Sequence, residues 1–147
     1  MTFAEEIENE IKEFINKIGN IHYHSDSNYG VEYLNNNFSF LGTKIDLSKE
    51  NNYTSHDFKE NDFLDMMKFF EFKDIKEKIL ESNEIHYVGD GITDSELVFS
   101  GKEFFKVLEF LFINIQEHHY FFDVEKKWCL FIATEGWIAY GEKSIKE

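Results

Sequence analysis

The feature that most constrains this chain is its closing stretch, residues 128–141, which reads WCLFIATEGWIAYG. Two apolar runs flank Thr134, Glu135 and Gly136. Three-residue hairpin loops commonly end in a residue with a left-handed backbone, so the spacing predicts two adjacent antiparallel strands with Gly136 completing the loop. Together with the preceding run HYFFDV, residues 119–124, this end of the chain predicts a three-stranded meander.

Three upstream segments have the spacing of helices. Apolar residues recur at helical intervals over residues 3–18, and Thr2 with Glu5 fits a capping box in front of them. A second apolar stripe covers residues 62–82. A third segment, residues 101–117, is apolar on nearly every side, which predicts a deeply buried helix.

Short strands are expected between these helices. EIHYVGD and SELVFSG predict a strand pair around the turn GDGITD, and alternation predicts one or two strands within residues 20–47. We interpret residues 51–61 as a polar connection because they show no apolar period. The order of elements predicts an α+β fold, in which about three helices pack mainly on one face of an antiparallel sheet of about five strands. A chain of this length suits a single domain, residues 1–147.

The charge of the chain excludes some partners. The 29 acidic residues outnumber the 15 basic ones, the net charge is −14, and there is no arginine. Nucleic-acid binding needs a clustered basic face, and anionic membranes also repel an acidic surface, so we expect neither as a partner. The surplus carboxylates can instead attract a basic protein, or can simply keep an aromatic-rich domain soluble.

Residues that could carry catalysis or hold a cofactor form no complete motif. Cys129 lies in an apolar run and is expected to pack as a buried hydrophobe. His22 and His24 would face the same way on a strand, but spacings such as CxxC or HExxH are lacking, so we expect no metal and no cofactor. The N-terminus lacks the basic and apolar regions of a leader, and no run approaches the ~20 apolar residues of a membrane span. A cytoplasmic protein is therefore expected.

The string VGDGITDSEL, residues 88–97, resembles the GDGxxD motif of haloacid-dehalogenase-type phosphatases. That resemblance implies that Asp90 and Asp94 hold magnesium at the end of a strand. The family also needs an aspartate nucleophile in a DxDx[TV] loop, and this chain contains no D-x-D. We therefore expect a protein that is not an enzyme, and keep a small magnesium-dependent phosphatase-like hydrolase as an alternative.

The closing segment HHYFFDVEKKWCLFIATEGWIAYGE, residues 118–142, is similar to segments of bacterial immunity proteins. In such proteins, from polymorphic-toxin and contact-dependent growth inhibition systems, a strand with aspartate leads to a Lys-Trp strand, and a final strand ends in an aromatic residue and glycine. The resemblance implies a cytoplasmic inhibitor without chemistry of its own, which binds one toxin domain as a monomer in a 1:1 complex. Charge makes a basic toxin, such as a nuclease, the expected target. An acidic adaptor for another basic protein is a further alternative.

Contact residues for that partner are expected in acidic turns, because loops at one end of a sheet can converge on a ligand. Such turns could form a negative rim around exposed aromatic residues such as Tyr87 or Trp137. The predicted hairpin tip around GDGITD supplies three acids, two other turns supply one each, and the connection after residue 56 supplies the rest. The expected partner-binding set is Asp57, Glu60, Asp62, Asp90, Asp94, Glu96, Glu125, Glu135 and Trp137.

Overall fold

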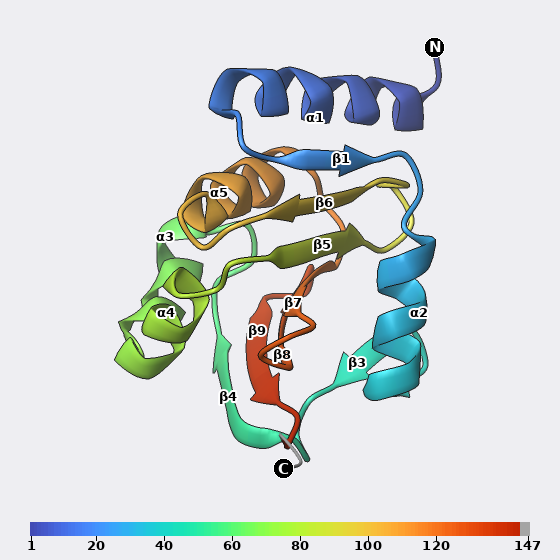
Figure 1. Ribbon diagram of the computed structural model, residues 1–147. Helices are drawn as coiled ribbons and strands as arrows, with labels where there is room; N and C mark the ends of the chain where they lie inside the picture. Colours follow the sequence, from blue (N-terminus) through green and yellow to red (C-terminus); the bar gives the residue numbers. More distant parts are fainter. Residues whose placement is uncertain (145–147) are drawn as a thin grey trace.

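A seven-stranded antiparallel sheet forms the centre of the molecule, in the order β1-β6-β5-β7-β8-β9-β4 (Figure 1). The computed structural model describes residues 1–144, apart from the Lys73 side chain. The strands of this sheet are β1 (His22–His24), β4 (Asn51–Asp57), β5 (Ile85–Gly89), β6 (Glu96–Phe99), β7 (His119–Asp123), β8 (Trp128–Ala133) and β9 (Trp137–Glu142). A separate hairpin pairs β2 (Ser39–Leu41) with β3 (Lys44–Asp46). The α+β class is confirmed, while the described sheet has seven strands instead of about five.

Helices cover both faces of this sheet. One face carries α1 (Phe3–Ile18), α3 (Phe63–Met67), the 3-10 turn η1 (Lys68–Glu71), α4 (Lys73–Leu80) and α5 (Phe104–Asn114). The opposite face carries α2 (Asn28–Asn37) and the β2–β3 hairpin (Figure 1). Four of the five described α-helices therefore lie on one face, as expected, although the number of helices is larger than the predicted three, and α2 with the β2–β3 hairpin covers the other face. The cause is that the central strands are apolar on both sides, as in β8, where all six residues are buried, so both faces need a cover.

The larger core lies between the sheet and the four helices α1, α3, α4 and α5. Tyr87, Phe121 and Leu130 project from the strands into it and are fully buried. Phe104 and Leu111 of α5 meet them and are also fully buried. Because burial of each large apolar side chain is worth about 1.5–3 kcal/mol, this core holds α5 across the sheet. The helix is shorter than the predicted residues 101–117, and only one side of it is buried, since Ile113 is 59% exposed.

The smaller core lies under α2 and the β2–β3 hairpin. Leu34 of α2 and Ile45 of β3 pack here with Phe122 and Phe131 of the sheet. The helix approaches the sheet closely at Gly30, where a Cβ atom would lie 2.6 Å from Glu96 Oε1. A side chain at this position would therefore push α2 away from the strands.

Two sequence predictions about the strands have different outcomes. The three-stranded meander is confirmed, since β7, β8 and β9 pair antiparallel and Gly136 has a φ of 106° in the β8–β9 loop. Residues 51–57, predicted as part of a connection, instead form β4 and pair with β9. This strand is largely exposed, and an edge strand with so little burial needs few apolar residues.

Candidate functional site

The acidic loops meet at one end of the sheet. The pairing register places Gly89 opposite His119, and Trp137 opposite both Ala133 and Asp57. The loops that follow β4 and β5, precede β7 and join β8 to β9 therefore lie at the same end. We call this region the acidic end and define it as residues 57–62, 90–95, 116–118 and 134–137.

Seven of the nine predicted partner-binding residues lie at the acidic end. They are Asp57, Glu60, Asp62, Asp90, Asp94, Glu135 and Trp137. All are exposed except Asp62 and Trp137, which are half-buried. Asp62 accepts a hydrogen bond from the Asp65 backbone N–H at 3.0 Å and so caps α3. Glu135 pairs with Lys44 of β3.

The other two predicted residues lie elsewhere. Glu125 is exposed in the β7–β8 turn, at the opposite end of the sheet. Glu96 belongs to β6 and not to a hairpin tip, and its 3% exposure leaves it little surface to offer a partner. Its Oε1 accepts from the Gly30 N–H at 2.8 Å, so it anchors α2. Tyr87, expected as an exposed aromatic residue, is fully buried.

The turn GDGITD is organised by a carboxylate from another loop. Glu117 Oε1 accepts from the backbone N–H groups of Asp90 at 2.7 Å and Ile92 at 3.0 Å. Its Oε2 accepts from the Thr93 N–H at 3.1 Å and from the Thr93 hydroxyl. A Cβ atom at Gly89 would lie 2.6 Å from Oε2, so glycine here permits the close approach. The backbone amides of this turn therefore donate to a carboxylate of the chain itself.

The side chains of Asp90 and Asp94, the residues implied as magnesium ligands, are exposed on this turn. The Asp94 backbone N–H donates to Glu8 Oε2 of α1 at 3.0 Å, which ties the turn to the first helix. Within residues 1–144, no group of three or more His, Cys, Asp or Glu side chains is placed to hold a metal ion. His22 and His24 are both exposed on β1.

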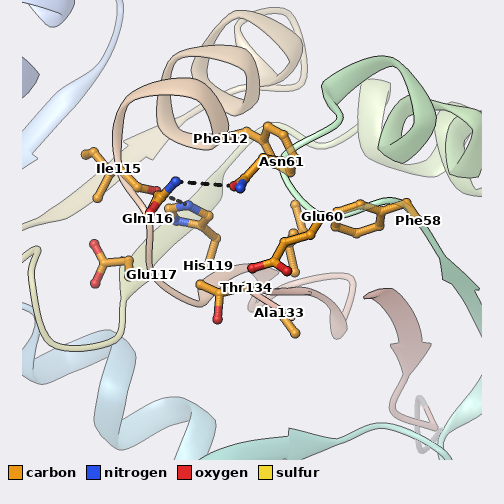
Figure 2. A pocket seen from close by; sticks show the side chains of 11 residues that line it. Phe58, Glu60, Asn61, Phe112, Ile115, Gln116, Glu117, His119, Ala133 and Thr134 are labelled. Carbon is orange, nitrogen blue, oxygen red and sulfur yellow. Dashed lines mark hydrogen bonds between the residues drawn. The ribbon is translucent and has the colours of Figure 1, made fainter. Parts of the chain in front are cut away.

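A cavity of about 60 Å³ opens between the loops of the acidic end (Figure 2). Its walls come from the segment after β4, from the chain between α5 and β7, and from the end of β8. The Gln116 side-chain amide donates to Asn61 Oδ1 at 3.3 Å and links two of these segments (Figure 2). The lining residues are Phe58, Glu60, Asn61, Phe112, Ile115, Gln116, Glu117, His119, Ile132, Ala133 and Thr134.

The buried polar groups of this cavity are a carboxylate and an uncharged imidazole. Burial lowers the pKa of His119 to about 4, so the ring is neutral near pH 7. Its Nε2–H donates to the Ile115 carbonyl at 3.0 Å, and its Nδ1 accepts from the Tyr87 hydroxyl at 2.7 Å. Glu117 is 6% exposed, and its hydrogen-bond donors in the described residues are all uncharged. The cavity is therefore a region of negative potential.

A second polar cluster lies beneath α2. The His86 ring contacts Glu96 Oε2 through Nδ1 at 2.8 Å and Glu84 Oε1 through Nε2 at 3.0 Å. Burial disfavours the charged ring, but the two carboxylates outweigh burial and raise the pKa of His86. A hollow of about 290 Å³ beside the ring is also lined by Tyr29. This cluster joins α2 to the sheet and does not reach the acidic loops.

Sequence reasoning did not find Glu117 or His119 as site residues. Glu117 and the turn it organises are up to 27 residues apart in the chain, and nothing in the spacing links them. The available signal was a lone glutamate just before a strand, beside a glycine-rich turn that needs acceptors for its amides. His119 is adjacent to His118 in the sequence, and only the structure shows that His119 is buried whereas His118 is half-buried.

Comparisons of the chain with protein-family models, with curated proteins and with solved structures found no match. Among the described residues, no helix has both the length and the apolar character needed to cross a lipid bilayer. Any functional assignment therefore depends on the geometry of the chain itself.

Proposed function

We propose that this chain is an immunity-type inhibitor, which binds one basic toxin domain through the acidic end and blocks its action without chemistry of its own. The observation that supports the proposal is the convergence of acidic loops from distant parts of the sequence at one end of a single sheet. The proposal includes a 1:1 complex in the cytoplasm. A nuclease is the target class we favour, because nucleases present basic surfaces to phosphate.

The charge of the acidic end is largely unpaired. Its defined segments contain seven acidic residues, counting buried Glu117, and one lysine, Lys59. Within the described residues, Glu135 has an ion pair with Lys44, while Asp57, Asp90 and Asp94 have none. Exposed carboxylates without counterions attract a basic partner and can raise association rates by roughly 10- to 1,000-fold.

The acidic end is also rigidly supported. Glu117 gathers the amides of the turn after β5, and Asp62 caps α3. A loop that is ordered before binding loses less conformational entropy when the complex forms. The acidic end thus combines a strong negative field with a preformed shape, which is what a tight stoichiometric inhibitor needs.

The proposal is tested with a candidate toxin domain encoded by a gene next to that of this chain. Co-expression of the two should restore growth of cells that the toxin alone kills. The double variant Asp90→Lys/Asp94→Lys should lose this protection, because both side chains are exposed and their reversal removes four charge units from the acidic end. Equal killing with and without the wild-type chain would reject the proposal.

The matched control reverses two exposed acids at the other end of the sheet, Glu81→Lys/Glu125→Lys. The Lys126 ammonium group lies 3.5 Å from the Glu81 carbonyl, which places both residues near the β7–β8 turn. This control has the same net charge as the test variant and should protect as well as wild type. If both variants lose protection together, total charge and not the acidic end governs binding. An acidic adaptor for another basic protein would bind that protein and leave the toxin active.

A further inference from the structure

We propose that the cavity at the acidic end is a receptor for one lysine side chain of the partner, with the Glu60 carboxylate at its mouth contacting the ammonium group. This inference rests on the proposed function, because the lysine would come from the toxin domain. It names the chemistry that the partner must present at the centre of the interface.

The charge of the cavity selects a cation. Its described lining contains two carboxylates, Glu60 and Glu117, and no lysine. The one histidine in the lining, His119, is fully buried and donates its Nε2–H to a backbone carbonyl, so it brings no competing positive charge. Electrostatic attraction between a carboxylate and a cation is stronger in a region of low dielectric constant than in water.

The size of the cavity limits which chemical groups can enter it. The cavity volume of about 60 Å³ exceeds the ~10–15 Å³ that a cavity needs to hold one water molecule, so the cavity admits a small polar group. The ammonium end of a lysine side chain fits such a space. The walls include Phe58 and Phe112, whose ring centroids are 5.8 Å apart, and apolar walls suit the methylene stem of lysine.

The hydrogen bonding of Glu117 favours lysine over arginine. Both of its oxygens already accept hydrogen bonds from the turn after β5. A carboxylate engaged in this way cannot also receive the two parallel bonds of a guanidinium fork. The Glu60 carboxylate could accept either cation, so the small volume of the cavity decides in favour of the compact ammonium group of lysine.

Figure 2 shows how the parts are arranged. The Glu60 side chain projects between the aromatic wall and the β8 end of the cavity, while Glu117 lies on the other side of the His119 ring. Thr134 lies below the ring, at the edge of the β8–β9 loop. A cation that enters beside Glu60 therefore meets the Glu60 carboxylate first, with the His119 ring between it and Glu117.

The first arm of the test needs no partner protein. The chain is titrated with n-butylammonium, an analogue of the lysine side chain, and backbone amide resonances are followed by NMR. Saturable shifts at Gln116, His119 and Thr134 are expected, with weaker effects from n-butylguanidinium and none from n-butanol. The Glu60→Gln variant should weaken binding by about threefold to fivefold, and Glu81→Gln should leave it unchanged. Stronger binding of the guanidinium compound, or equal binding of butanol, would overturn the lysine assignment.

The second arm uses the complex with the toxin domain. Glu60→Gln should weaken complex formation, measured by calorimetry, while Glu81→Gln should not. If the chain protects cells but butylammonium does not bind and Glu60→Gln has no effect, the lysine receptor is wrong and the inhibitor proposal stands. If butylammonium binds at the cavity and the chain gives no protection, the inhibitor proposal fails on its own.

Discussion

The Glu117→Gln variant measures how much the buried carboxylate contributes to the fold. Glutamine has nearly the same shape but replaces one oxygen with an NH2 group. The oxygen that accepts from Asp90 and Ile92 can be kept, whereas the NH2 group then faces the N–H and the hydroxyl of Thr93, which is 3% exposed. Each buried donor left without an acceptor costs about 1–3 kcal/mol, so we expect a loss of roughly 2–4 kcal/mol after partial relaxation.

Urea unfolding followed by tryptophan fluorescence measures this loss. With a urea m-value of about 2 kcal/mol/M, typical of a small domain, the midpoint should fall by roughly 1–2 M at an unchanged m-value. The matched control is Glu109→Gln, an exposed glutamate of α5, which should change stability by less than about 0.5 kcal/mol. A Glu117→Gln midpoint equal to that of the control would refute the idea that this carboxylate organises the turn.

Three further predictions concern other buried positions. Gly101→Ala should cost at least about 1–3 kcal/mol in thermal unfolding, because its Cβ would lie 2.4 Å from the Leu80 carbonyl oxygen; a neutral change would contradict this. The pKa of His86 is raised in the folded protein, so the charged ring stabilises the fold at pH values below the unfolded-state pKa of about 6.5. This stabilisation is lost as the pH rises through the folded-state pKa. The wild type should therefore lose more stability than His86→Gln as the pH rises above about 6.5, and equal pH dependence of the two proteins would contradict the interaction of His86 with Glu96. Burial raises the pKa of the Cys129 thiol, so a thiol reagent should label the native protein no faster than it unfolds, and rapid labelling would show an open route.

The elements that could be predicted from the sequence are those whose apolar spacing and capping residues all lie within one continuous segment. The α1 helix has an apolar stripe and a cap, in which Thr2 Oγ1 accepts from the Glu5 N–H at 3.1 Å. The α2 helix was missed because the residues it buries are Gly30 and Leu34, and glycine weakens a helical prediction. Its stability comes from contact with the sheet, which a local pattern does not contain.

Most residues of the candidate site could be predicted from the sequence, but not which of them lie together in the folded chain. Exposed acids in turns are visible in the sequence, whereas their meeting at one end depends on which strands pair and in which direction. Glu96 shows the limit most clearly. It is two residues beyond Asp94, yet it enters β6 and binds the Gly30 N–H under α2, while Asp94 remains exposed.

The two tryptophans lie on opposite faces of the sheet and so supply separate optical reporters. Trp128 is 1% exposed in the larger core, where its Nε1–H donates to Ser82 Oγ at 3.0 Å. Trp137 packs on Phe131 beside the smaller core, with ring centroids 5.0 Å apart. In a variant that retains only one tryptophan, the tryptophan fluorescence therefore reports on one side of the sheet alone. Time-resolved emission from the pair of single-indole variants would thus establish whether the layer containing α2 melts in step with the four-helix layer or ahead of it.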